Sequence, residues 1–165
     1  MTSLKDSFQS MVFIDCPACK RRALKSKWEK NYYVCPICGH YRAMSAHDRL
    51  SALLDPGSMH ELDRKYPAAD PLQFPDYQEK LKLQKQKTGL NEAVVTATGK
   101  IGGINCVVAV LDSRFFMGSM SSAVGEKVTR AVEHAAAEKL PLIIFSASGG
   151  ARMQEGIYSL MQMAT

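Results

Sequence analysis

Residues 140–155 read LPLIIFSASGGARMQE, an apolar run followed by two glycines. The run LIIF predicts a buried strand, and the periodic apolar residues after residue 152 predict a helix. Glycine is needed where the backbone takes positive φ or approaches another group closely, and the start of a helix leaves N–H groups unpaired. Gly149 and Gly150 are therefore candidates for an anion hole, which would hold a phosphate or a developing oxyanion.

The segments before this turn predict an α/β unit. EAVVTATG (92–99) and INCVVAVLD (104–112) are β-branched runs joined through Gly102 and Gly103, which indicates a hairpin. A helix is expected over 119–139, then the strand at 142–145 and a last helix. The apolar residues of the two helices are spaced to share one face in each: Val124, Val128, Val132 and Ala135, then Met153, Ile157, Leu160, Met161 and Ala164. The predicted order is β, β, α, β, α, with a right-handed crossover into the third strand.

The glycine turn does not match the common phosphate-binding or nucleophile patterns. SGGARM lacks both the G-x-G-x-x-G of dinucleotide sites and the Gly-Lys-Ser/Thr of a P-loop. A nucleophilic Ser148 is conceivable, but the usual elbow reads G-x-S-x-G. Two interpretations stay open: Gly149 and Gly150 donate N–H groups to an oxyanion, or they only permit tight packing. The loop FFMGSM (115–120) also precedes a helix, so two such loops could line one pocket.

Residues 16–41 contain two Cys-x-x-Cys pairs separated by 15 residues, a spacing at the short edge of the zinc-ribbon range. Cys16, Cys19, Cys35 and Cys38 are the expected ligands of one Zn²⁺ per chain. Four thiolates leave no open coordination position, so the zinc is expected to be structural. The alternative is four unrelated buried thiols. A strand-like segment from Tyr32 to Val34 is expected between the pairs.

The chain of 165 residues has a formal net charge of +5, and residues 16–49 carry eight basic side chains against Glu29 and Asp48. Such a charge fits a polyanionic partner, either nucleic acid or a phosphorylated cofactor such as coenzyme A, but also fits plain solubility. No apolar run is long enough for a membrane span and no signal peptide is evident, so we expect a cytoplasmic protein without disulfides.

Three segments are expected: a zinc ribbon with an N-terminal tail at 1–45, a helical and proline-rich connection at 46–91, and half of an α/β domain at 92–165. In the connection, Ser45 with Asp48 predicts one helix start, and Asp76 with Glu79 predicts another that ends at Gly89. The last helix has an apolar stripe and no evident cap, so a fragment or truncated reading frame is expected.

The ordered set of motifs resembles the carboxyltransferase β subunit of bacterial acetyl-CoA carboxylases. It consists of the four-cysteine ribbon followed by AHDRLSALLDPGS, FMGSM, FSASGGARMQEG and SLMQMA, and the resemblance extends from Cys16 to near the end of the chain. It implies a crotonase-like fold of repeated ββα units. The implied reaction transfers carboxyl from carboxybiotin to acetyl-CoA, which forms malonyl-CoA for fatty-acid synthesis.

The resemblance also implies site residues and partners. Gly149 and Gly150 would hold the thioester enolate, Gly118, Ser119 and Met120 would wall the thioester pocket, and Arg152 would reach a CoA phosphate. The partners would be an α subunit in a heterotetramer, a biotin carboxyl carrier protein and a biotin carboxylase. The chain departs from the family in two respects. Ser121 follows FMGSM, where the family commonly has glycine, and the family's β subunit is considerably longer than 165 residues.

Two other classes of function remain open from the residues. A basic ribbon with Trp28, Tyr32, Tyr33 and Tyr41 among lysines and arginines is typical of nucleic-acid binding, although the aromatics also suit a small core. A serine hydrolase would need Ser148 as its nucleophile.

Overall fold

The computed structural model describes residues 12–147 and 149–164, and the chain divides into two compact units, residues 1–44 and 45–165. Ser148 and the first residues lie outside the described part, so the nucleophile hypothesis for Ser148 has no structural description. Within the described residues, no helix has the length and apolar character needed to cross a membrane.

Over its described residues, 12–44, the first unit is a small ribbon in which two short strands are followed by the helix α2 (Lys25–Lys30). Strand β1 (Phe13–Asp15) pairs antiparallel with β2 (Arg22–Leu24), and α2 follows directly. Trp28 is fully buried and packs in a cluster with Cys16 and Cys35. The expected strand at 32–34 is wrong, because Tyr32 and Tyr33 have positive φ and Val34 makes a single antiparallel bridge to Tyr41.

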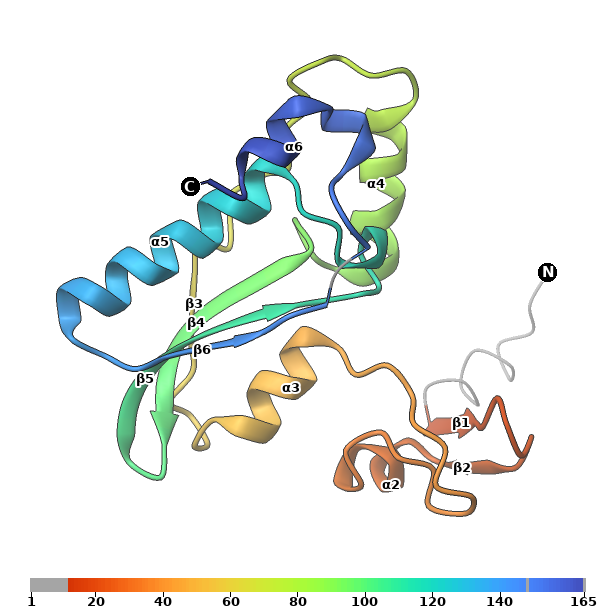
Figure 1. Ribbon diagram of the computed structural model, residues 1–165. Coiled ribbons are helices and arrows are strands. Elements are labelled where there is room, and N and C mark those ends of the chain that lie inside the picture. Colours follow the sequence, from red (N-terminus) through yellow and green to blue (C-terminus); the bar gives the residue numbers. More distant parts are fainter. Residues whose placement is uncertain (1–11, 148, 165) are drawn as a thin grey trace. The chain divides into compact units, whose positions relative to one another are not determined.

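The second unit is built on a four-stranded sheet in the order β3-β4-β5-β6 (Figure 1). Strand β4 (Val94–Ile101) and β5 (Ile104–Leu111) form the expected hairpin, with Gly102 and Gly103 at positive φ and both their N–H groups donated to Asp55. Strand β6 (Leu142–Phe145) runs parallel to β5. Strand β3 (His60–Leu62) was not expected, because three residues are too few for a pattern.

Two helices cover the two faces of this sheet. Helix α3 (Ala46–Leu53) and helix α5 (Ser122–Glu138) lie on opposite faces, and α4 (Tyr77–Thr88) packs into the same core (Figure 1). Strands β4 and β5 each have a continuous buried run, residues 94–97 in β4 and residues 106–110 in β5, without the alternation of a half-exposed strand, because both faces of the sheet are covered. Leu50, Leu54 and Leu81 share the core with the strands, so segment 46–91 belongs to the sheet's unit.

Serine side chains cap the starts of α3 and α5, and α5 begins at Ser122, three residues after the expected start at 119. The Ser45 hydroxyl accepts the Asp48 N–H at the start of α3, as expected, and Ser121 accepts the Val124 N–H at the start of α5. Gly89 ends α4 at φ 73°. Asp76 does not cap α4: its φ is 60° and its side chain makes no capping hydrogen bond.

The last predicted helix is broken. A 3₁₀ turn covers Met153–Glu155 and the helix α6 spans Ile157–Met161, with Gly156 at φ 54° and ψ −130° between them. The expected apolar face is not core, because Met153 is 83% exposed and Ile157 is 62% exposed. The helix is interrupted because the Glu155 side chain is fully buried, which places the turn at 153–155 against the protein interior.

Asp112 ties the end of β5 to the start of α3. Its buried carboxylate accepts the Ala46 N–H at 2.8 Å and pairs with Arg114 at 2.7 Å. Burial by itself would raise the pKa of Asp112, but the donors from Arg114 and Ala46 outweigh it and lower the pKa below its ordinary value.

We expect Asp112→Asn to destabilise this unit by about 2 kcal/mol at pH 7, the usual range for hydrogen bonds to a charged group. A lowered folded-state pKa contributes stability above the unfolded pKa of about 3.9, and that stability is lost as the pH falls toward the folded value. Urea unfolding is therefore measured at several pH values. The difference in the free energy of unfolding between the variant and the unaltered protein should be constant above about pH 5 and shrink below about pH 4. A difference that is unchanged down to about pH 3 would contradict this role.

Candidate active site and metal centre

Two loops meet at the carboxyl ends of the neighbouring parallel strands β5 and β6. The Met120 N–H donates to the Gly150 carbonyl at 2.9 Å, and the Arg152 N–H donates to the Met120 carbonyl at 2.8 Å. The structure therefore brings together all the residues named from the sequence in both loops: Gly118, Ser119, Met120, Gly149, Gly150 and Arg152. Ligand sites of open α/β sheets form at this edge.

The first loop contains a left-handed turn of three residues. Phe116, Met117 and Gly118 have φ of 44°, 58° and 74°. A left-handed conformation costs about 1–2 kcal/mol for each non-glycine residue, so Phe116 and Met117 must be held in place by their surroundings. The sequence shows only the glycine of this turn, and the two preceding residues carry no signal for positive φ.

The glycines of the two loops serve different needs. A Cβ on Gly118 would collide with the Ala147 carbonyl oxygen, and one on Gly149 would lie 2.9 Å from the Met117 Cβ. Gly150 has φ +87°, and a Cβ there would meet nothing within 4 Å. Gly118 and Gly149 thus permit close packing of the loops, while Gly150 faces open space.

Gly149 is an exposed residue, and its N–H makes no hydrogen bond within the part of the chain that the structure describes. The first turn of α5 is different: the Ser122 N–H donates to Glu155 at 2.7 Å, and Ser121 takes the Val124 N–H. The expectation that the two loops line one pocket stays a prediction. Gly149 offers a backbone donor, whereas side chains occupy these two donors of α5.

Arg152 lies inside the protein, with 1% of its surface exposed. Its guanidinium donates to Glu92 at 2.8 Å, to the Tyr77 hydroxyl at 2.9 Å and to the Ser119 hydroxyl at 2.6 Å. Burial by itself would lower the pKa of Arg152, but Glu92 and Tyr77 outweigh it and raise the pKa. This burial speaks against contact with a CoA phosphate.

Glu155 and Tyr77 complete this buried network. The Tyr77 hydroxyl donates to Glu155 at 2.8 Å, and the Ser122 hydroxyl donates to the other oxygen of Glu155 at 2.7 Å. Burial, reinforced by the Glu155 carboxylate, raises the pKa of Tyr77 well above its ordinary value. Sequence reasoning missed Glu92, Tyr77 and Glu155 as members of the site. The available signal was an acid directly before an apolar strand, at Glu92.

An apolar cavity of about 540 Å³ adjoins the first loop. Gly118 and Met120 line it from the loop, and Val124, Val128 and Ile144 line it from α5 and β6. A cavity with mostly apolar walls and backbone polar groups at one end suits a small-molecule ligand.

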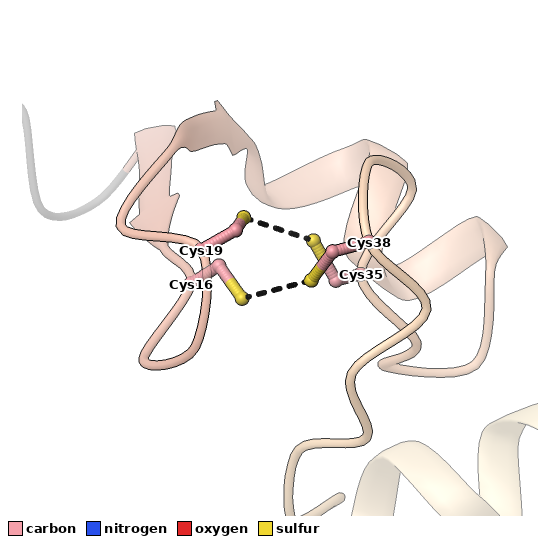
Figure 2. Close-up of side chains that lie close together, drawn as sticks. All are labelled: Cys16, Cys19, Cys35 and Cys38. Atoms are coloured by element: carbon pink, nitrogen blue, oxygen red, sulfur yellow. Dashed lines mark hydrogen bonds between the residues drawn. The ribbon is translucent and has the colours of Figure 1, made fainter.

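The four cysteines of the first unit converge on one point (Figure 2). Their sulfurs all lie within 4.8 Å of one another, with Cys16 to Cys38 at 3.6 Å and Cys19 to Cys35 at 4.0 Å. A Zn–S distance of about 2.3 Å places the sulfurs of a tetrahedral site about 3.8 Å apart. The cluster therefore fits a tetrahedral zinc, and the alternative of four unrelated thiols is wrong.

The two Cys-x-x-Cys turns have the same backbone pattern. The Cys16 N–H donates to the Arg21 carbonyl and the Lys20 N–H to Cys16, and Cys35, His40 and Gly39 repeat both bonds. Lys20 (φ 59°) and Gly39 (φ 76°) both have positive φ at the same position. Burial would raise the pKa of Cys16, but backbone N–H donors from Cys19 and Ala18 help to lower it to about 6. Such donors stabilise a thiolate, the form that binds metal.

The fold, the paired loops and the comparisons with known proteins lead to one family. Residues 45–165 match the family model of the carboxyl transferase domain, so the chain belongs to that family. This part is a mixed α/β, crotonase-like partial domain, and the four-cysteine cluster lies before the matched residues.

Solved structures agree with this assignment. The chain is similar to transcarboxylase 12S, solved with methylmalonyl-coenzyme A and methylmalonic acid bound, with 30% identity and a TM-score of 0.62 over 74% of this chain and 22% of that one. A Pseudomonas malonate decarboxylase hetero-tetramer in complex with malonate shows 29% identity and a TM-score of 0.56 over 74% of this chain and 45% of that one. The β subunit of P. aeruginosa geranyl-CoA carboxylase, at 23% identity, a TM-score of 0.56 and coverage of 85% and 22%, shares the fold. The chain thus spans less than half the length of each.

Proposed function

We propose that this chain is the β-type carboxyltransferase subunit of an acetyl-CoA carboxylase, which transfers carboxyl from carboxybiotin to acetyl-CoA and so forms malonyl-CoA. The observation that carries the proposal is the junction of the two loops, where the exposed residue Gly149 packs against Met117 of the left-handed turn in a carboxyl transferase domain. An enolate oxygen needs such preorganised backbone donors.

In this proposal, Gly149 and Gly150 hold the thioester oxygen while the methyl carbon loses a proton and accepts the carboxyl group. Gly118, Ser119 and Met120 form the wall beside the thioester, and the apolar cavity next to Gly118 accommodates the bound acyl-CoA. Arg152 stays behind this wall and makes no substrate contact. Glu92 and Glu155 are both buried and hydrogen-bonded, which supports proton removal by the cosubstrate instead of a protein carboxylate.

The ligands in the titles of the similar structures support the substrate class. Malonate and methylmalonyl-coenzyme A each carry a carboxylate one carbon away from a carbonyl carbon, the arrangement that malonyl-CoA also has. The specific choice of acetyl-CoA, and the role in fatty-acid synthesis, rest on the resemblance of the ordered motifs together with the four-cysteine ribbon.

We propose one structural Zn²⁺ per chain, held by Cys16, Cys19, Cys35 and Cys38. Four thiolates fill the coordination sphere, so the metal would supply folding energy and no catalysis. The proposed partners are an α subunit in a heterotetramer, a biotin carboxyl carrier protein and a biotin carboxylase, all in the cytoplasm. The similar structures are described as a hexamer and a hetero-tetramer, which supports an assembly of several chains.

The test uses the assembly purified from its own cells through a tag on this chain. Carbon dioxide incorporation that depends on carboxybiotin is measured with acetyl-CoA, propionyl-CoA and geranyl-CoA. We expect acetyl-CoA to have the highest kcat/KM, by at least about tenfold, as a small preformed acyl site discriminates by about this factor per methylene. Preference for a larger acyl group would keep the carboxyltransferase class and reject the acetyl-CoA assignment.

A second function, nucleic-acid binding by the ribbon, is supported by one observation. Tyr32 and Tyr41 are 64% and 80% exposed among basic side chains, while Trp28 is buried in the ribbon core. Exposed aromatics beside positive charge can stack on bases. Because binding to phosphates releases counterions, single-stranded RNA should bind with an affinity that falls steeply between about 50 and 200 mM salt. The double variant Tyr32→Ala, Tyr41→Ala is compared with the unaltered chain. Equal affinity of the two proteins for single-stranded RNA would reject this function.

A further inference from the structure

The Arg152 side chain contacts the strained turn of the first loop at both of its ends. The guanidinium carbon of Arg152 lies 4.7 Å from the centroid of the Phe116 ring, at the start of the left-handed turn. The same guanidinium donates to both the hydroxyl and the carbonyl of Ser119, which follows the turn, at 2.6 and 2.9 Å. Arg152 therefore contacts the residues on either side of Met117 and Gly118.

Backbone hydrogen bonds also join the two loops. The Arg152 N–H donates to the Met120 carbonyl, and the Met120 N–H donates to the Gly150 carbonyl. Met120 thus links the first loop to both Gly150 and Arg152 of the second loop. An added Cβ on Gly149 would lie 3.3 Å from the Met117 carbonyl oxygen, which shows how little space separates the two turns. A shift of Arg152 would move both loops.

The other contacts of the guanidinium anchor it to distant parts of the chain. Glu92 precedes β4 and Tyr77 begins α4, and both bond to Arg152 although they are 60 and 75 residues away in sequence. The Arg152 and Glu92 side chains are 1% and 0% exposed. Because a planar guanidinium has donors in fixed directions, these anchors fix the plane that contacts Phe116 and Ser119.

We infer that Arg152 is a positioning residue, which fixes the left-handed turn at 116–118 against the glycine turn at 149–150 and thereby sets the geometry of the oxyanion donors. Its effect on turnover rests on the proposed carboxyltransferase function. Its effect on the order of the turn does not.

The test compares Arg152→Lys with the unaltered protein and with Arg130→Lys as a matched control. Lysine keeps the charge opposite Glu92 but cannot make the bonds to Tyr77 and Ser119 and the ring contact together. Arg130 also pairs with two carboxylates and lies 4.9 Å from a tyrosine ring, that of Tyr66, but it is on the exposed face of α5. The control is expected to match the unaltered protein in all measurements.

Two readouts are measured on the folded fraction of each protein. Amide hydrogen exchange at Gly118 and Ser119, whose N–H groups donate to Phe115 and Phe116, is expected to quicken at least about tenfold in Arg152→Lys, while the β4–β5 hairpin is unchanged. In the intact assembly, kcat is expected to fall at least about 30-fold with KM changed less than about threefold, because oxyanion donors act in the transition state. A purely structural role predicts normal kcat for each folded molecule.

Should Arg152→Lys fail to fold, the double variant Arg152→Met with Glu92→Gln removes both charges of the buried pair and is measured in the same way. Unchanged exchange at Gly118 and Ser119 in a folded variant would overturn the inference, as would faster exchange with kcat unchanged. If the unaltered assembly transfers no carboxyl group, the proposed function fails, and the exchange measurement alone then decides whether Arg152 orders the turn.

Discussion

Cys35→Ser is expected to release zinc and to unfold the ribbon, residues 12–44, while the second unit keeps its own melting transition. The buried core of the ribbon consists of Trp28 and two of the cysteines, Cys16 and Cys35, so this unit has almost no apolar interior apart from its metal site. Structural zinc contributes on the order of 10 kcal/mol to the folding of such small modules. Serine oxygen does not replace the thiolate, so that contribution is lost.

The measurement combines metal analysis with two-dimensional NMR of each variant. Cys106→Ser is the matched control, because Cys106 is 2% exposed and lies in the sheet of the second unit. Its hydroxyl can replace the bond that the Cys106 thiol donates to the Gly99 carbonyl. We expect one zinc per chain in the control and none in Cys35→Ser. One zinc per chain and an unchanged Trp28 signal in Cys35→Ser would reject the four-thiolate site.

Gly150→Ala is expected to lower kcat for carboxyl transfer at least about 100-fold, the usual cost of disturbing one oxyanion-hole donor. The added methyl group meets no protein atom within 4 Å, so it projects into the open side of the turn where the thioester oxygen is proposed to bind. The positive φ of 87° adds a backbone cost of about 1 kcal/mol for any residue with a Cβ.

Gly57→Ala separates these two effects. Gly57 has φ +76° and nothing within 4 Å of an added Cβ, so it carries the same backbone cost away from the loops. Both variants should lose similar stability in thermal unfolding, while only Gly150→Ala loses activity. Equal kcat values for the two variants would remove Gly150 from the oxyanion site.

Local chemistry is what the sequence predicts well in this protein. The Gly102–Gly103 hairpin, the Ser45 cap and the Gly89 helix end each depend on neighbouring residues, and the structure confirms all three. The cysteine cluster was predictable although its ligands come from two separated turns, because the Cys-x-x-Cys spacing encodes each turn.

Contacts between distant residues were not predictable in the same way. Arg152 was expected to reach a CoA phosphate, but its partners, Glu92 and Tyr77, lie far away in sequence and bury it. The last helix failed for the same reason: periodicity predicted a continuous helix, but burial of Glu155 against Tyr77 and Ser122 forces a turn at Gly156. Tertiary burial of charged groups overrides local pattern at both places.

If this chain forms the carboxyl-transfer site, the assembly must also catalyse the reverse reaction. The assembly that contains this chain is incubated with malonyl-CoA and free biotin, and acetyl-CoA is measured with and without biotin. We predict biotin-dependent formation of acetyl-CoA that is abolished by Gly150→Ala and retained by Gly57→Ala. Malonyl-CoA that stays unchanged in the presence of biotin, with the assembly intact and its zinc bound, would show that this chain does not form the carboxyl-transfer site.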